Sequence, residues 1–389
     1  MKKIKFGLLP RILVAIALGV ALGGVLPEWG IRTFLTFNGL FSQLLGFLIP
    51  LIIVGMVIPA IADIGRGAGR MLLFTVLLAY ASTIVAGLVS YFTGALTFPS
   101  LIESSASLDA ATETAKLAPY FTVAIDPLMS VMTALVLAFM VGLGLAYLKG
   151  DALRKVAVDF GDLVTMTIES VIIPLLPLYI FGIFLEMTAA GEVMRVIGVF
   201  IKIIGVIFVL HIVWLVLLYS VAGLLTKRNP FKMLGTMLPA YFTALGTQSS
   251  AATIPVTLQQ TRKNGVSEDV AGFVVPLCAT IHMSGSTLKI VACALALMIM
   301  QGMPYDFGMF FGFICMLGIT MVAAPGVPGG AIMASLGLLQ SMLGFDQEAQ
   351  ALMIALYIAM DSFGTACNVT GDGAIALIVD KITNKSNNQ

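Results

Sequence analysis

The stretch Ala359-Met-Asp-Ser-Phe-Gly-Thr-Ala-Cys-Asn-Val-Thr-Gly-Asp372 decides how the rest of the chain is interpreted. It lies in an otherwise apolar segment, residues 349–382, and carries polar side chains at successive spacings of 4, 3 and 4 residues: Asp361, Thr365, Asn368 and Asp372. At about 100° per residue, these side chains fall within about 60° of one another on a helix. Carboxylates in a membrane segment are costly and usually face protein or water, where they bind ions or substrate. We interpret the stripe as a binding site, the alternative being two paired or snorkelling acids.

The composition of the whole chain is typical of a polytopic membrane protein. Hydrophobic residues make up 59% of the 389 residues and charged residues only 11%, and the mean hydropathy is +1.04, whereas soluble domains are far less apolar. A formal net charge of +1 gives no reason to expect nucleic-acid binding. The cysteines all lie in apolar stretches, where we expect packing residues without disulfides: Cys278, Cys293, Cys315 and Cys367.

The predicted fold class is an all-α polytopic membrane protein with eight transmembrane helices and two re-entrant helical hairpins. Residues 1–5 resemble the start of a signal peptide, but no small-residue cleavage site follows, so we expect the first apolar run to remain as a span. Segments long enough to cross a bilayer lie at residues 10–27, 38–62, 71–97, 119–148, 161–185, 194–225, 267–301 and 349–382.

Charged residues between the spans predict the orientation. Basic residues lead the chain and follow the second, fourth and sixth spans, as at Arg66, Lys149 and Lys227. The connections after the third and fifth spans are acidic, as at Glu103 and Glu186. By the positive-inside rule, we expect a multi-pass protein of the plasma or inner membrane with both termini in the cytoplasm.

Two further apolar stretches are broken in their middles. Residues 231–261 have basic clusters on both sides, and residues 307–345 have acids on both sides, so each should return to the side from which it enters. Their tips are rich in helix-breaking residues, at Gly246–Pro255 and Ala324–Gly330. Irregular backbone at membrane depth is tolerated where it lines a cavity, and transporters place their sites at such breaks. The alternative is two kinked spans.

The segment 267–301 has an interruption of its own, at Ala279–Ser286. Within and just after it, His282, Ser286 and Lys289 share one helical face. The ammonium of Lys289 is followed by six apolar residues and therefore needs a buried partner. The carboxylates of the last span supply the two candidates for that partner, Asp361 and Asp372.

The broken hairpin Thr247-Gln-Ser-Ser-Ala-Ala-Thr-Ile-Pro-Val-Thr257 and the last-span stretch 359–372 together resemble the dicarboxylate/amino acid:cation symporters. This family includes archaeal aspartate transporters, glutamate transporters and neutral amino acid exchangers. The resemblance covers the whole chain, loosely before residue 230 and closely after it. It implies a homotrimer in which a scaffold of early spans holds a transport core that crosses the membrane as an elevator.

The resemblance also implies a division of the chain. Residues 1–75 would supply scaffold spans one and two, and residues 76–118 a transport-side span three with an outer loop. Residues 119–225 would hold spans four and five of the scaffold and a transport-side span six. Residues 226–389 would form the transport core, made of a first hairpin at 229–262, a span at 267–301, a second hairpin at 307–345 and a last span at 349–382.

Substrate roles carry over to matching residues. The carboxylate of Asp361 would hold the amino group of the substrate. The amide of Asn368, with hairpin backbone near Ser249 and Ser250, would hold its α-carboxylate. The remaining residues expected around the substrate are Ser286, Val327, Gly364 and Thr365.

Cation roles carry over in the same way. The carboxylate of Asp372 would bind sodium together with the backbone carbonyls of Cys278 and Asn368, and buried opposite charges attract strongly in a low dielectric. Na⁺ is the expected coupling ion, H⁺ is possible, and no covalent cofactor is expected. A second sodium site would be built mostly from carbonyls, near Thr280, Met283, Met321, Val322 and Ala324.

Three departures from the family pattern bear on the substrate and the ions. Gly364 stands where acidic amino acid transporters have an arginine that binds a side-chain carboxylate. The usual Asn-Met-Asp-Gly-Thr reads His282-Met-Ser-Gly-Ser286, so Ser284 replaces the main ligand of a third sodium site. Lys289 replaces a common aromatic residue, and it would either stand in for the arginine or, as we expect, point to the vacated sodium site. We therefore take His282, Ser284 and Lys289 as candidates for ion coupling.

The predicted function is cation-coupled symport of small, neutral amino acids, without catalysis. An alternative is symport of acidic amino acids or dicarboxylates held by Lys289. An intramembrane aspartyl protease also uses two membrane aspartates, but Asp361 and Asp372 would lie about 16 Å apart on one helix, and a dyad needs about 3 Å. An ion channel is a further alternative, for which no filter sequence stands out.

Overall fold

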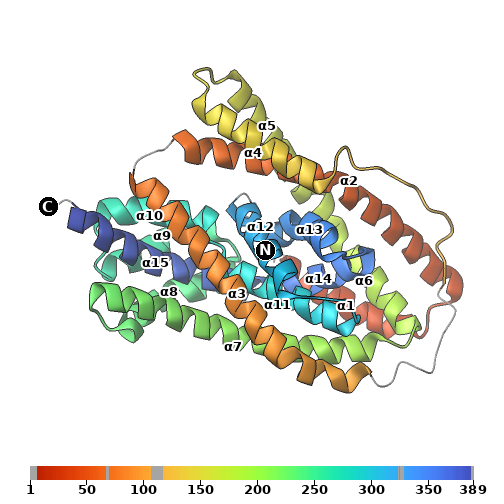
Figure 1. Cartoon of the computed structure of the whole chain (residues 1–389). Helices are drawn as coiled ribbons and strands as arrows, with labels where there is room; N and C mark the ends of the chain where they lie inside the picture. Colours follow the sequence, from red (N-terminus) through yellow and green to blue (C-terminus); the bar gives the residue numbers. More distant parts are fainter. Residues whose placement is uncertain (1–6, 67–69, 107–116, 323, 325–327, 387–389) are drawn as a thin grey trace, which may run out of the picture.

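The computed structural model describes residues 7–66, 70–106, 117–322, 324 and 328–386, and every regular element in this part of the chain is a helix (Figure 1). Within it, five helices are long and apolar enough to cross a membrane, and the bent pair α14–α15 makes a sixth span if it is counted as one. The predicted all-α polytopic class is confirmed. The predicted eight full-length spans do not appear one for one, because two of them are shorter apolar helices, α1 and α4.

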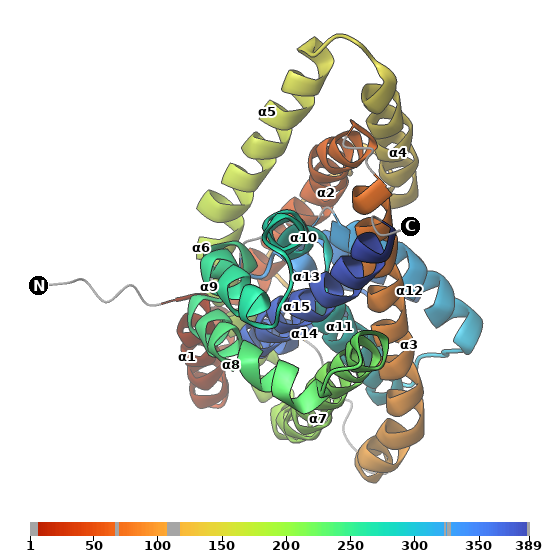
Figure 2. The same ribbon diagram turned by 90° about the vertical axis from the view of Figure 1, so that its left-hand side faces the viewer.

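The first half of the chain forms α1 to α6. Helices α1 and α2 pack against α6, α2 also packs along α4 and α5, and α3 packs along α11. In Figure 2, α4 and α5 lie at the outer edge of the molecule. The bounds are α1 (Leu8–Gly23), α2 (Glu28–Arg66), α3 (Arg70–Ala106), α4 (Val131–Tyr147), α5 (Ala152–Thr167), the π-helical η1 (Ile168–Ile172) and α6 (Ile173–Ala189).

The predicted fourth span at 119–148 is wrong in its first part. Residues 117–130 form no helix, and α4 begins only after Ser130, whose side chain accepts the N–H of Thr133. The earlier stretch contains two prolines, which lack the N–H that a helix needs. Its backbone instead donates to side chains of α2: the N–H of Tyr120 bonds to Thr36 at 2.9 Å and that of Ile125 to Gln43 at 3.2 Å.

Two helical hairpins occupy the predicted positions. In the first, α8 (Pro230–Thr247) and α9 (Ser250–Lys263) pack together across a break at Gln248, whose φ is 54°. In the second, α12 (Phe307–Val322) packs on α13 (Gly330–Leu343), which starts after Gly329 at a φ of 76°, a value that glycine adopts readily. The predicted pairs of helices are therefore confirmed, and their entry from opposite membrane sides stays a prediction.

The remaining helices form the centre of the molecule. Helix α15 (Asp361–Ser386) lies in the middle of Figure 2, in contact with α7 (Val193–Thr226), both helices of the first hairpin, α10 (Glu268–Ile281) and α11 (Ser284–Met300). The predicted interruption of the seventh span is confirmed, because α10 and α11 are separated by His282 and Met283. The polar residues at 361, 365, 368 and 372 all lie on α15.

The last span is broken as well, which the sequence analysis did not predict. Helix α14 (Gln347–Ala359) meets α15 at a bend of 61°. The carbonyl of Tyr357, which a continuous helix would give to residue 361, instead accepts from Lys289 and from the N–H of Met360. A side chain inserted into the helical hydrogen-bond ladder is a known cause of such kinks.

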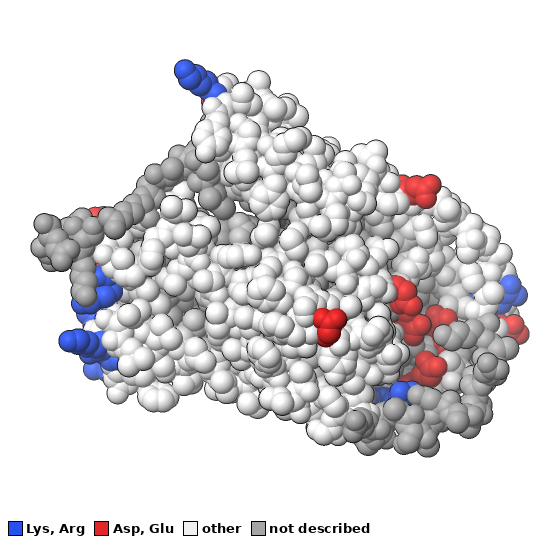
Figure 3. All heavy atoms as spheres, viewed as in Figure 1, with Lys and Arg blue, Asp and Glu red and all other residues white. Residues whose placement is uncertain are grey.

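The surface agrees with a protein that lies in a bilayer. On the face shown in Figure 3, charged side chains gather mainly at the two ends, with most Lys and Arg toward the left and most Asp and Glu toward the right. The surface between the ends is almost entirely uncharged. The chain is therefore a multi-pass membrane protein by composition and structure; its orientation stays a prediction.

Candidate substrate and ion site

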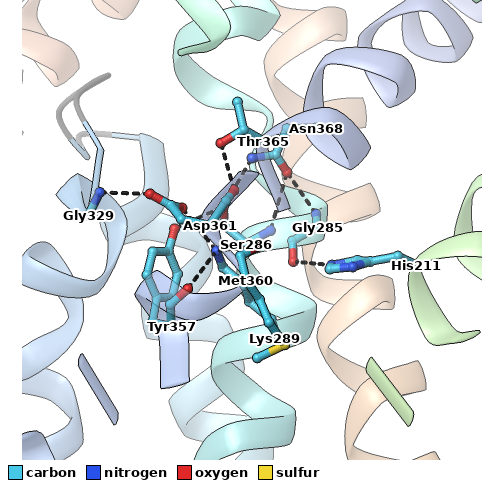
Figure 4. Close-up of polar contacts among 10 residues, drawn as sticks. All are labelled: His211, Gly285, Ser286, Lys289, Gly329, Tyr357, Met360, Asp361, Thr365 and Asn368. Carbon is cyan, nitrogen blue, oxygen red and sulfur yellow. Dashed lines mark hydrogen bonds and ion pairs between the residues drawn. The ribbon is translucent and has the colours of Figure 1, made fainter. Parts of the chain in front are cut away.

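The polar stripe of α15 is enclosed by other helices. Asp361, Thr365, Asn368 and Asp372 are 5%, 8%, 4% and 1% exposed. Asp361 begins α15 and contacts the start of α13 through the N–H of Gly329, and the start of α11 contacts α15 at Asn368 (Figure 4). N–H groups at helix starts favour anionic and other acceptor groups, and here Asp361 and Asn368 accept those of Gly329, Gly285 and Ser286.

Lys289 pairs with Asp361. Its ammonium lies 2.9 Å from Oδ1 of Asp361, and the two side chains are 0% and 7% exposed. The ammonium also donates to the carbonyls of Tyr357 at 3.4 Å and Met360 at 3.5 Å. Of the two predicted partners, the structure selects Asp361, and the expected orientation of Lys289 toward the vacated sodium site is wrong. At this carboxylate the carbonyls of Tyr357 and Met360 supply the ammonium with two further acceptors.

The stem of Lys289 fills the space beside Gly364. A Cβ placed on Gly364 would meet Nζ, Cε and Cδ of Lys289 at 2.9, 3.0 and 3.3 Å. Lys289 therefore lies where a side chain at position 364 would begin. The sequence alternative in which the lysine takes the place of the missing arginine is the one that this geometry matches.

Asp361 also contacts the second hairpin. Its Oδ2 accepts the backbone N–H of Gly329 at 2.8 Å, at the start of α13 (Figure 4). One carboxylate thus joins α11, through Lys289, to the second hairpin. The sequence analysis missed Gly329 and Tyr357 as site residues, because a backbone donor and a carbonyl acceptor leave no mark in residue type; the aromatic ring of Tyr357, which lies against the ammonium of Lys289, was the signal that could have found it. Val327, predicted at this tip, lies outside the described residues.

Asn368 fastens α15 to the first turn of α11. Its Oδ1 accepts the N–H groups of Gly285 at 2.8 Å and Ser286 at 3.2 Å, and its Nδ2 donates to the hydroxyl of Ser286 at 3.0 Å. These bonds satisfy donors that a helix start leaves unpaired. Thr365 donates within its own helix, to the carbonyl of Asp361 at 3.0 Å.

His282 connects Asp372 to α3. One ring nitrogen, Nδ1, lies 2.9 Å from Oδ1 of Asp372, and Nε2 lies 2.9 Å from the hydroxyl of Ser82. The other carboxylate oxygen of Asp372, Oδ2, is buried without a hydrogen-bond partner. A buried, unpartnered carboxylate oxygen is costly unless a cation binds it, so this atom fits the proposed sodium ligand. Sequence analysis did not find Ser82, which lies 200 residues from its partner.

Helix α7 holds the break between α10 and α11. Trp214 donates to the hydroxyl of Ser284 at 3.1 Å, and Nε2 of His211 lies 3.0 Å from the carbonyl of Gly285. The hydroxyl of Ser284, a candidate for ion coupling, therefore accepts one of the hydrogen bonds that join α7 to the break. His211 is buried and hydrogen-bonded.

The other predicted residues lie at varied depths. Cys278 is buried and its carbonyl accepts the N–H of His282 at 2.9 Å. Thr280 is exposed and donates to the carbonyl of Leu277. Of the further residues expected at a second sodium site, three are buried and the last is half-buried: Met283, Met321, Ala324 and Val322.

At the tip of the first hairpin, Ser249 and Ser250 are half-buried. The hydrogen bonds of Ser249 join it to Thr247, Ala252 and Thr253 of the same hairpin. Its side chain caps α9 by accepting the N–H of Ala252 at 3.3 Å. Both serines therefore form the start of α9, and no bond described here joins Ser249 to the stripe on α15.

A known protein family matches nearly the whole chain. The model of the sodium:dicarboxylate symporter family matches residues 8–382. The chain belongs to this family. The family is one of transporters, so the aspartyl protease alternative is dropped, and with it any enzymatic assignment. The resemblance stated from the hairpin and last-span motifs is confirmed.

Individual relatives are more distant. The chain is 27% identical to a serine/threonine transporter, SstT, of Acinetobacter baumannii, with 97% of each protein covered. It is 29% identical over 252 residues to human excitatory amino acid transporter 2, covering 62% of this chain and 43% of the relative. With excitatory amino acid transporter 1 of Rattus norvegicus it shares 30% identity over 241 residues, covering 60% and 44%. The chain thus spans under half the length of these excitatory transporters.

Proposed function

We propose that the protein is a sodium-coupled symporter of small amino acids that carry no net charge. The observation that carries this proposal is the buried ion pair of Lys289 and Asp361 beside Gly364. It is supported by the full-length similarity to a protein named as a serine/threonine transporter.

The charge of the site favours a zwitterion. The ammonium and carboxylate of the pair sum to zero, and both are buried. A zwitterion can enter between them, its ammonium facing Asp361 and its carboxylate facing Lys289 and the helix starts, with every charge met by an opposite one. With Lys289 facing the α-carboxylate, an acidic amino acid or a dicarboxylate would add a carboxylate for which the described residues around the pair hold no second ammonium or guanidinium, which costs several kcal/mol.

The volume of the site favours a small side chain. In acidic amino acid transporters the position of Gly364 carries an arginine; here the lysine stem lies within 3.3 Å of where a Cβ would be. The space beside α15 is therefore filled by methylene groups of the protein itself. Substrates of the size of alanine, serine or threonine fit this arrangement better than larger ones do.

Asp372 is the proposed sodium ligand, with the carbonyls of Cys278 and Asn368 beside it. The unpartnered Oδ2 supports this role. His282 and Ser82 fill the neighbouring space between α10 and α3 with a hydrogen-bonded pair. We therefore propose fewer than three sodium ions per cycle, with coupling that arises from the mutual dependence of ion and substrate binding.

The larger-scale assignments follow from family membership as proposals. They comprise a homotrimer in the cell membrane, cytoplasmic termini, and a transport core at residues 226–389 that moves against a scaffold. Within the transport core, the two hairpins and α15 would move together, because α15 packs on both helices of the first hairpin and Asp361 joins α15 to the second hairpin and α11.

The test is a thermal-shift panel in detergent, because a ligand that binds the folded state raises its apparent stability. Each of the twenty amino acids and several dicarboxylates is added with NaCl or with choline chloride. Alanine, serine and threonine should raise the melting temperature only in sodium. Stabilisation by aspartate or succinate, without any by serine, would replace this proposal by the acidic-substrate alternative.

A further inference from the structure

The ammonium of Lys289 lies in a binding site whose acceptors match a primary amine, and we call this site the receptacle. Its three N–H bonds meet three acceptors: Oδ1 of Asp361 at 2.9 Å and the carbonyls of Tyr357 and Met360 at 3.4 and 3.5 Å. The ammonium also lies 3.3 Å from the centroid of the Tyr357 ring, a cation–π contact. A lysine ammonium has three donors and no acceptor, so each of its donors has one acceptor in the receptacle.

The acceptors of the receptacle belong to the end of α14 and the start of α15. Both carbonyls lie at the bend where α14 ends, the end of a helix that carries negative partial charge. The carboxylate belongs to the first residue of α15, and its second oxygen is held by Gly329. A different ammonium that took the place of Lys289 could donate to the same carboxylate and the same two carbonyls, and so hold the bend as Lys289 does.

We propose that this receptacle is a shared ammonium site, filled by Lys289 when the protein is empty and by the α-ammonium of the substrate when it is loaded. The inference rests on the proposed function, since it assumes an amino acid substrate. Lys289 then acts as a tethered counter-cation, and the carboxylate of Asp361 is paired in both states. The empty protein needs no cation from solution to neutralise Asp361 when it returns across the membrane.

The physical reason is the cost of an unpaired buried carboxylate. Leaving one member of a buried ion pair alone is strongly unfavourable, and more so in a membrane interior. A symporter without Lys289 would have to bind a dissolved cation at Asp361 before each empty return. The flexible four-carbon stem lets the ammonium move from Asp361 toward the incoming carboxylate of the substrate while it stays in the same pocket.

The first experiment asks whether the receptacle binds free ammonium once the tether is removed. Lys289→Ala is titrated with ammonium chloride and methylammonium chloride at constant ionic strength, and the melting temperature is measured. We expect saturable stabilisation of the variant by both ions, none by tetramethylammonium, which has no N–H donor, and none of the parent protein by any of the three. Absence of stabilisation in the variant, or equal stabilisation of the parent, overturns the proposal.

Two further variants test whether the stabilisation by ammonium arises at the receptacle. Lys202→Ala removes an exposed lysine of α7 that also donates to a carbonyl, that of Leu101, and it should behave as the parent does. Lys289→Ala combined with Asp361→Asn removes the carboxylate from the receptacle and should abolish the ammonium response. If the double variant still responds, the ions bind elsewhere and the receptacle is not their site.

A transport assay covers the case in which Lys289→Ala does not fold. Lys289→Met keeps the length of the stem and is reconstituted in liposomes with serine. Lys289→Met also removes a partner of the substrate carboxylate, so serine–serine exchange should fall too, but net uptake, which includes an empty return, should fall by about tenfold or more beyond that loss, because an unpaired charge must then cross the membrane. An equal loss of both activities, or a loss of neither, overturns the tethered counter-cation. Absence of both in the parent protein would instead count against the proposed function, on which the ammonium titration does not depend.

Discussion

At the scale of single residues, the two carboxylates of α15 have different surroundings. Asp361 is held at both oxygens, by Lys289 and by the backbone of Gly329. Asp372 is held at one oxygen by His282, and its other oxygen has no partner. The arrangement at Asp361 fits the proposed exchange of one ammonium for another, and the arrangement at Asp372 fits the proposed binding of a cation.

Replacing Asp372 by Asn should therefore abolish sodium-dependent substrate binding. The amide keeps the size of the side chain, but it removes the negative charge and can turn an N–H donor toward the place of a cation. The measurement is the sodium dependence of serine stabilisation and uptake. Asp269→Asn, an exposed change in the first turn of α10, is the control. Unchanged uptake with unchanged sodium dependence in Asp372→Asn would rule out the proposed ion ligand.

Asn368 permits a second prediction at this scale. Asn368→Ala leaves the buried N–H groups of Gly285 and Ser286 without their acceptor, which should destabilise the protein by about 1–3 kcal/mol. Thr365→Val, which removes only a bond within α15, should cost less. Denaturation midpoints in detergent of the two variants give the comparison. Equal effects would show that Asn368 is not what holds the start of α11.

At the scale of elements, α11 and α15 cross at a glycine. A Cβ on Gly285 would lie 2.6 Å from Cβ of Cys367 and 2.9 Å from the carbonyl oxygen of Gly364. The start of α11 thus lies against the first two turns of α15, and the close approach allows Asn368 to reach the N–H groups of the first turn of α11. The site depends on this crossing more than on either helix alone.

Gly285→Ala should push the two helices apart. Overpacking of this kind costs about 1–3 kcal/mol, and it should weaken sodium-dependent serine binding as well, because Asn368 loses its alignment. Gly272→Ala on α10, where a Cβ would meet nothing within 4 Å, is the matched control and should leave both properties unchanged. The melting temperature and the affinity for serine are measured on both. A Gly285→Ala protein as stable and as tight-binding as the parent would contradict the close crossing.

At the scale of the whole molecule, the prediction concerns sidedness. Lys263 ends α9 in a basic cluster, and Gln347 starts α14 between two acids, and both are exposed. By the positive-inside rule, Lys263→Cys should react with an impermeant thiol reagent only from the cytoplasmic side and Gln347→Cys only from the opposite side. The assay uses sealed vesicles of both orientations. The parent protein, in which three of the four cysteines are buried, supplies the background. Labelling of both positions from one side would refute the inverted arrangement of the hairpins.

Local chemistry explains how much of the fold was readable from the sequence. The breaks at the first hairpin, at the second hairpin and at residues 279–286 are marked by glycine, proline and serine, whose effects act within a few residues. The stripe on α15 follows from the helical period. The break at Met360 was not readable, because it depends on a lysine 71 residues away that donates to the carbonyls at the bend.

The sequence by itself determined the class of the protein, its hairpins, the polar face of α15 and, through the motifs on them, its family. Only the tertiary structure decided which charge meets which. Lys289 had two candidate carboxylates at similar helical positions, and packing of α11 against α14 and α15 selected Asp361. Packing of α3 against α10 likewise brought Ser82 to His282 across 200 residues. Pairing energy in a buried site depends on separations of a few ångströms, and these are set by helix packing rather than by local sequence.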